Sequence, residues 1–208
     1  MEINKIDGLE FLEEKHYYKF NGKYIPSVSS IIKPISSSIY GEIDKEILQK
    51  AADRGTAVHW AIELLNTTGA EIIENEFAGY FTAYKKFREE HKNLKVIASE
   101  IRTMHPTLWY AGTADEIYED ENGNYILTDT KTSVNIEKAI LIPQLTGYRE
   151  ALQESQKINI SKCFVLHLKN DGNYIFEEIQ TDLSILLACI KINNFVQKNK
   201  NQFKYGGK

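Results

Sequence analysis

The spacing of hydrophobic positions changes along this chain, from every third or fourth residue in some stretches to strand-like patterns in others. Helical spacing predicts helices at residues 42–66, 74–91, 143–154 and 182–197. Stretches rich in strand-forming residues and bounded by polar turns predict strands at residues 94–104, 112–119, 125–133, 162–169 and 174–180. This order of elements predicts an α/β fold with a mixed β-sheet of about five strands flanked by helices.

In the first forty residues the sequence predicts shorter secondary-structure elements. Residues 16–20 and 23–25 predict a hairpin around an Asn-Gly turn. Ser27 or Ser29 is expected to cap a short helix that ends at Pro34.

Glycine and proline positions refine three further stretches. Residues 36–41 predict a polar loop, and the helix that follows is expected to break or bend near Arg54-Gly55. Pro143 is expected in the first turn of its helix, where its missing N–H costs nothing.

Length and composition are those of one globular domain: 208 residues, 42% hydrophobic and 26% charged. Within a single domain 1–208 we expect a helical part at about 26–92, a sheet core at about 94–180 and a C-terminal helix at about 182–197. We find no apolar run of transmembrane length and no signal-peptide core, so no membrane association is expected. The two cysteines are isolated, which favours a reducing cytoplasm. A net charge of −4 does not exclude nucleic-acid binding, because binding depends on where cations cluster.

The predicted hairpin at residues 112–133 carries the most informative charges. Its five-residue loop determines how the two strands pair, and counting back from the loop places Asp115 opposite Asp129. Lys131 lies two residues further along the second strand. Directly opposite side chains share a face, with Cβ atoms about 5 Å apart. The hairpin therefore brings two carboxylates and an ammonium to one end of one sheet face.

Two opposed carboxylates repel each other unless a cation lies between them. Oxygen ligands at this separation suit Mg²⁺ or Mn²⁺, and Lys131 is then close to a phosphate oxygen. Such a group fits phosphodiester hydrolysis, in which a metal ion generates the nucleophile and a cation stabilises charge. The same three residues are equally compatible with an exposed hairpin that carries ordinary surface charges, because Asp-x-Lys is a short motif.

Acidic and imidazole side chains on other elements extend the set. His59 and Glu63, four residues apart, project from one side of a helix, and this histidine is either a packed core residue or a metal ligand. Glu100 extends the apolar row of Val96 and Ala98 by the two-residue period, either as a third acid at the site or as an edge residue.

Other side chains are candidates for substrate contacts. Arg54, Ser27 and Ser29 are placed to bind phosphate, with a solvated helix-end cation and a plain N-cap as the alternatives. Gln144 and Tyr148 are neighbours on a helix surface and either point into a cleft or form a polar helix side.

In sequence order the candidates form five motifs: Arg54-Gly55-Thr56-x-x-His59-x-x-x-Glu63, Glu100, Gly112-Thr113-Ala114-Asp115, Asp129-Thr130-Lys131-Thr132 and Gln144-x-x-x-Tyr148. Their order resembles the PD-(D/E)XK nuclease superfamily, and within it the RecB-like branch that includes phage-type exonucleases and the mitochondrial genome-maintenance exonuclease. The resemblance extends from about Pro26 to Glu178. It implies a restriction-endonuclease-like core.

The resemblance also implies a role for each matched acid. Asp115, Asp129, His59 and the backbone carbonyl of Thr130 would hold one or two Mg²⁺ or Mn²⁺ ions. Glu100 matches the family's upstream acid, which lies near the metal or its waters.

Lys131 would position the attacking water and stabilise the charge on the phosphate. Gln144 and Tyr148 would hold the substrate strand or the lysine.

The chain departs from the family in three respects. Ala114 stands where the motif has proline, a change that RecB-like members tolerate. Two scattered cysteines, Cys163 and Cys189, do not suffice for the four-cysteine iron–sulfur cluster of some members. There is no helicase portion, so a helicase or recombination partner would be a separate chain.

The sequence thus predicts a metal-dependent deoxyribonuclease, more specifically an exonuclease in DNA repair, recombination or phage DNA processing. One alternative is a nuclease-fold module that binds DNA ends or a partner without cutting. Another is a phosphoesterase that acts on RNA or small nucleotides.

Overall fold

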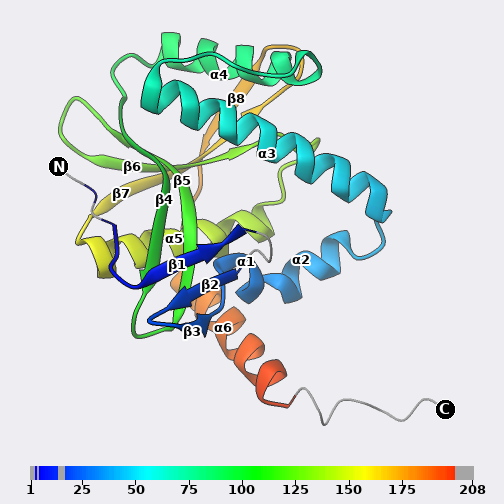
Figure 1. Ribbon diagram of the computed structural model, residues 1–208, viewed down its shortest axis with the longest axis vertical. Helices are drawn as coiled ribbons and strands as arrows, with labels where there is room; N and C mark the ends of the chain where they lie inside the picture. The colour runs from blue at the N-terminus through cyan, green and yellow to red at the C-terminus, as the bar shows by residue number, and fades with distance from the viewer. Residues whose placement is uncertain (1–2, 4, 14–16, 200–208) are drawn as a thin grey trace.

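The computed structural model describes residue 3, residues 5–13 and residues 17–199. Within them the central feature is a five-stranded sheet in the order β4-β5-β6-β7-β8 (Figure 1). β6 and β7 are parallel, and the other neighbouring strands are antiparallel. The predicted α/β class with a mixed sheet is therefore confirmed. The strands are β4 (Lys95–His105), β5 (Tyr110–Glu119), β6 (Tyr125–Lys131), β7 (Ile160–Leu168) and β8 (Tyr174–Glu178).

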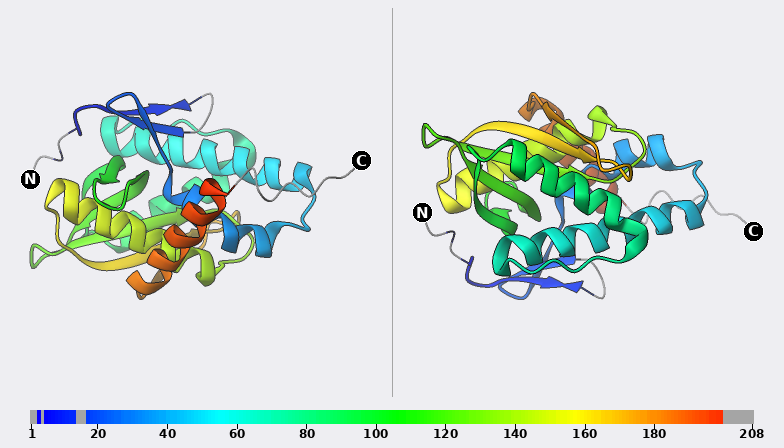
Figure 2. Two further views of the ribbon diagram at one scale, coloured as in Figure 1. Left: turned by 90° about the horizontal axis from the view of Figure 1, so that it is seen from below. Right: turned by 90° about the horizontal axis from the view of Figure 1, so that it is seen from above.

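Helices cover both faces of this sheet (Figure 2). One face carries α3 (Lys45–Thr68), the short 3-10 helix η2 (Asn75–Phe77) and α4 (Ala78–Glu90). The other carries α5 (Lys138–Gln156) and α6 (Leu183–Lys198). α5 is the crossover between the parallel strands β6 and β7, a connection that two-residue turns cannot make.

Each face of the sheet has its own apolar cluster. Between the sheet and helices α3 and α4, Phe87 packs with Tyr118 of β5. Ile117 and Leu127, which are paired across β5 and β6, share a cluster with Leu145 of α5 on the opposite face. Side chains on both faces of β5 are thus buried, so a charged residue on this strand is unusual.

The N-terminal residues form a small second sheet of β1 (Leu9–Leu12), β2 (Tyr17–Phe20) and β3 (Lys23–Ile25). β2 and β3 form the predicted hairpin, although His16 lies outside the described residues. This sheet packs on one end of β4 and β5, where Tyr18 shares an apolar cluster with Met104.

The chain then passes along the start of β5. Ala111 N donates to Pro26 O over 2.9 Å, and Ser27 bridges to Ala111 in the parallel direction. Helix α1 (Val28–Ile31) begins at this point, and Ser27 caps it as predicted, with its Oγ accepting from Ser30 N at 3.0 Å. Residues 26–30 are therefore held beside β5.

The loop predicted at residues 36–41 is wrong, because helix α2 (Lys33–Tyr40) occupies this stretch. Pro34 lies in the first turn of α2 instead of simply ending α1. The serine hydroxyls are satisfied inside the helix: Ser36 Oγ donates to Lys33 O and Ser38 Oγ donates to Ile35 O. Strand β1 was not predicted, since its four residues carry too little alternation to be recognised.

Two expectations about the long helices are also wrong. α3 continues without a break through Arg54-Gly55, because a glycine costs only about 1 kcal/mol in a helix whose next turns bury Val58, Ala61 and Ile62. Pro143 lies inside α5 and not in its first turn, since the helix already begins at Lys138.

None of the helices within the described residues combines the length and the apolar character needed to cross a membrane.

Candidate functional site

Strands β5 and β6 pair in the predicted register only as far as Glu116 and Thr128. The expected pair of Asp115 with Asp129 is not formed in the ladder, because the strands separate at this point. Ile117 pairs with Leu127, and the paired segment ends at Glu116 and Thr128. Beyond that point Asp115 Oδ2 accepts a hydrogen bond from Thr130 N at 2.7 Å. In a regular ladder this N–H would donate to a backbone carbonyl of the neighbouring strand. The carboxylate of Asp115 therefore replaces the next rung of the sheet and is held rigidly between the strands.

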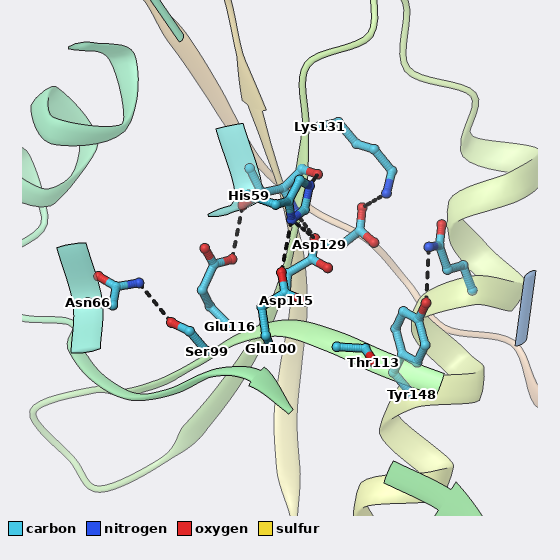
Figure 3. Close-up of polar contacts among 12 residues, drawn as sticks. His59, Asn66, Ser99, Glu100, Thr113, Asp115, Glu116, Asp129, Lys131 and Tyr148 are labelled. Carbon is cyan, nitrogen blue, oxygen red and sulfur yellow. Dashed lines mark hydrogen bonds and ion pairs between the residues drawn. The ribbon is translucent and has the colours of Figure 1, made fainter. Parts of the chain in front are cut away.

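His59 of α3 reaches this opening from the side. Its Nδ1 lies 3.2 Å from Glu100 Oε1 and 3.8 Å from Asp115 Oδ2, and its Nε2 lies 3.0 Å from Thr130 O (Figure 3). One ligand atom each from His59, Glu100 and Asp115 lie within 4.8 Å of one another. Among the described residues, this is the group of His, Cys, Asp and Glu side chains whose geometry suits a metal ion.

Glu100 joins the group because β4 is irregular at two places. A bulge between Val96 and Ala98 shifts the register, and these two side chains pack in different apolar clusters. The expectation that Val96, Ala98 and Glu100 share one face is therefore wrong. Glu100 itself has φ +50°, a left-handed conformation that costs a non-glycine residue about 1 to 3 kcal/mol. This strained backbone places its carboxylate beside His59.

Asp129 and Lys131 form a separate pair next to the group. Lys131 Nζ lies 2.5 Å from Asp129 Oδ2, and the Asp129 side chain is 1% exposed (Figure 3). Asp129 Oδ1 is buried without a hydrogen-bond partner among the described residues. Burial by itself would lower the pKa of Lys131, but Asp129 and Asp115 outweigh it and raise that pKa, so the ammonium stays charged.

The pKa values of the buried groups in the cluster are raised above their ordinary values. Burial by itself would lower the pKa of His59, but Asp115 and Glu100 raise it to about 10. Burial raises the pKa of Asp115 despite the nearby His59 and Lys131. Burial likewise raises the pKa of Asp129 to about 6, although Lys131 opposes this. The raised pKa values show that the protein alone does not fully compensate the negative charge of these acids, and a divalent cation such as Mn²⁺ or Mg²⁺ fits the same nitrogen and oxygen donors.

Glu116 is a buried acid of the cluster that our sequence analysis did not select. It is 1% exposed, and its Oε2 accepts a hydrogen bond from Thr130 Oγ1 at 3.0 Å. Burial, reinforced by Asp115, raises its pKa to about 8. Because side chains alternate along β5, Glu116 lies on the face of the strand opposite Asp115, among the aromatic residues. A charged residue on a strand buried on both faces was the signal that could have identified it.

The cluster opens into a cleft of about 920 Å³. This cleft collects most of the predicted site residues, which come from six different elements of the fold. Those that line it are Ser27, Ser29, Arg54, His59, Glu100, Asp115, Thr130, Lys131 and Tyr148. Asp129 and Gln144 do not line it: Asp129 is paired with Lys131, and Gln144 Nε2 lies 3.4 Å from Oη of the cleft residue Tyr148.

Two cleft residues are held by close contacts. Arg54 Nε donates to Thr132 Oγ1 at 3.3 Å, and its guanidinium lies over the Tyr80 ring. Tyr148 lies against Gly112, where a Cβ would come within 2.5 Å of Tyr148 Cε1. Glycine at position 112 thus allows the tyrosine to approach the start of β5.

We expect the metal-free protein to lose stability as the pH rises from about 6 to about 9. In the folded state His59 and Glu116 keep their protons up to about pH 10 and about pH 8, whereas their ordinary pKa values are 6.5 and 4.5. The folded protein therefore binds more protons in this window, and its free energy of unfolding falls with rising pH. Thermal denaturation in EDTA should show a melting temperature that drops by about 5 °C or more.

Millimolar Mn²⁺ should remove most of this drop, because the cation replaces the bound protons and stabilises the folded state. Glu116→Gln should make the drop in EDTA smaller by removing one titrating group. A melting temperature that stays constant or rises between about pH 6 and about pH 9 in EDTA would contradict this account of the cluster.

This chain is similar to several solved structures. A putative exonuclease from Eubacterium rectale has a TM-score of 0.54 at 13% identity, covering 92% of this chain and 85% of that chain. An alkaline exonuclease from Laribacter hongkongensis has a TM-score of 0.42 at 16% identity, covering 86% of this chain and 87% of that chain. A phage-related exonuclease from Haemophilus somnus has a TM-score of 0.41 at 13% identity, covering 86% and 94%.

The sequence itself matches no protein-family model and no curated protein. At such low sequence identities a similarity to solved structures shows the fold alone. This conclusion rests on the structure from Eubacterium rectale, whose TM-score is 0.54.

Proposed function

We propose that this chain, whose architecture is the α/β fold of PD-(D/E)XK phage-type exonucleases, is a metal-dependent nuclease that hydrolyses DNA phosphodiester bonds. The observation that carries the proposal is the joint placement of His59, Glu100 and Asp115 beside Lys131 in one open cleft. Strained Glu100 and buried Asp129 both lower the stability of the fold, and such features persist where a site requires them.

His59, Glu100, Asp115 and the carbonyl of Thr130 would hold a Mg²⁺ or Mn²⁺ ion, with Asp129 as a further acid for one or two ions. When bound, the ion supplies Lewis-acid chemistry and makes a water nucleophilic near neutral pH. His59 must give up a proton to act as a ligand, since its raised pKa keeps it protonated in the metal-free protein.

Lys131 keeps its positive charge through Asp129 and lines the cleft, so its ammonium can stabilise negative charge that develops on a phosphate. Arg54 and the exposed hydroxyl of Ser29 offer further donors for phosphate oxygens. Tyr148, held against Gly112 and contacted by Gln144, shapes the wall behind Lys131.

The choice of DNA as substrate, of exonuclease over endonuclease activity, and of a role in repair, recombination or phage DNA processing rests on the family resemblance of the motifs. A helicase or recombination protein as a separate partner chain belongs to the same proposal.

The test is to incubate the purified protein with labelled single-stranded DNA, duplex DNA and RNA in Mg²⁺, Mn²⁺ or EDTA. We expect DNA cleavage in the two metals, none in EDTA, and mononucleotide release from strand ends. Metal-independent binding without cleavage would instead identify a DNA-binding module, and preferential cleavage of RNA would change the substrate class.

A further inference from the structure

Helix α3 presents small side chains to the cleft, with a tryptophan at the end of the strip that they form. The strip consists of Ala51, Ala52, Gly55 and Thr56, all of which line the cleft, and Trp60 follows one turn later. A Cβ built at Gly55 would contact nothing within 4 Å, so open space lies over the helix at this point. The strip therefore leaves room for an extended ligand along α3.

Trp60 leaves half of its surface uncovered by the rest of the protein. It is 50% exposed, and among the described residues its indole has neither a hydrogen bond nor an aromatic contact. Trp109 differs, because its Nε1 donates to Tyr24 O at 3.3 Å and its ring meets the edge of Phe20. A large aromatic face left free in a concave site is available to a ligand.

The position of Trp60 matches the chemistry proposed for the cleft. Trp60 lines the same cleft as His59, Glu100 and Asp115. Phosphate donors on Lys131 and Arg54 lie in the same cleft. The cleft thus combines groups for a charged backbone with one flat apolar surface.

We propose that Trp60 is a stacking platform for an unpaired base, and that the strip along α3 accommodates the backbone of the same strand. This inference rests on the proposed nuclease function and specifies its substrate class. A base inside a duplex is stacked on both sides and hydrogen-bonded at its edge, so it has no free face for an indole. The preferred substrate is therefore a single strand or a frayed end, because every unpaired base has a face that stacks on an aromatic side chain.

A two-by-two comparison tests the stacking contact. Wild type and Trp60→Ala are each assayed in Mn²⁺ on a series of single-stranded oligodeoxynucleotides. Each oligonucleotide carries one abasic site, at a different position along the strand. At one position, either change alone should lower kcat/KM by about ten-fold, and the two together should lower it no further. If the two losses multiply at every position, Trp60 does not stack a base.

Fluorescence tests the same contact without cleavage. Trp109→Phe leaves Trp60 as the one tryptophan of the chain, since the sequence contains two. Oligothymidylate added in Ca²⁺ or EDTA should quench its emission, whereas a blunt duplex and an abasic strand should quench it far less. Equal quenching by the duplex, or no quenching by oligothymidylate, would overturn the proposal.

Gly55→Leu separates binding from folding. Leucine favours the helix over glycine and its Cβ meets no neighbour, so the melting temperature should rise by about 2 °C or more while affinity for oligothymidylate falls about ten-fold. Gln49→Leu, an exposed position of the same helix that does not line the cleft, is the matched control. Equal affinities of the two variants would refute the strip as a strand-binding surface.

The two proposals can fail separately. If the wild type cleaves no phosphodiester in Mg²⁺ or Mn²⁺, the hydrolytic function fails, and the fluorescence titration alone then decides whether Trp60 stacks bases. If the wild type cleaves but Trp60→Ala slows intact and abasic strands equally, the function stands and the stacking platform is overturned.

Discussion

Lys131→Met is expected to reduce DNA cleavage by about a hundred-fold or more, because it removes the ammonium that we propose stabilises charge on the phosphate. Lys131 lines the cleft, and its pKa is raised by Asp129 and Asp115, so it is charged throughout the neutral range. Methionine keeps a similar length and apolar stem but carries no charge. Single-turnover cleavage of a labelled strand in Mn²⁺ measures the effect.

The same substitution should also destabilise the fold, by about 3 to 5 kcal/mol, since it leaves Asp129 buried without its cation. Asp129→Asn combined with Lys131→Met removes the unpaired charge and should recover most of that loss. The double variant should remain inactive. If it regains cleavage together with stability, the role of Lys131 is structural, and near-normal cleavage by Lys131→Met alone would exclude a catalytic role.

Asp115→Asn should reduce cleavage by about a thousand-fold while the metal-free protein keeps or gains stability. The amide oxygen can still accept the hydrogen bond from Thr130 N, so the gap between β5 and β6 stays filled. The negative charge is lost, however, and with it a ligand and the repulsion that contributes to the raised pKa of Glu116. Calorimetric titration with Mn²⁺ and thermal denaturation in EDTA measure the two effects.

Asp120→Asn is the matched control for Asp115, because it makes the same change in the same hairpin. Asp120 lies in the exposed turn, where its carboxylate accepts from Asn122 N and Asn124 N. This variant should lose a little stability and keep both Mn²⁺ binding and cleavage. Unchanged Mn²⁺ affinity and unchanged cleavage in Asp115→Asn would remove Asp115 from the metal site.

The predictions that agree with the structure depend on local chemistry. The loop between β5 and β6 determines the register by its length, and the expected pairs Ile117 with Leu127 and Glu119 with Tyr125 are present. Ser27 caps α1 for the same reason, since a hydroxyl and a backbone N–H three residues apart meet without help from the rest of the fold. The mixed sheet follows from the order of strands and helices.

The predictions that failed concern stretches where packing outweighs local preference. The serines of α2 look like a loop, yet Ile35 and Ile39 pack against the core and hold the segment helical. Gly55 looks like an interruption and Pro143 like the first turn of a helix, yet both lie inside long helices that are stabilised by their buried faces.

By itself the sequence determined the succession of strands in the central sheet along the chain, the hairpin register as far as Glu116 and Thr128, and the kinds of side chain that the cleft contains. Only the tertiary structure decided how they are grouped: Glu100 next to His59 through a strained backbone, Asp129 paired with Lys131, Glu116 buried and Trp60 left exposed. The physical reason is that hydrogen bonds within a hairpin or a helix turn depend on residues a few positions apart. By contrast, the way whole faces pack decides the contacts between α3, β4, β5 and β6. The spacing of residues along the chain does not predict this packing.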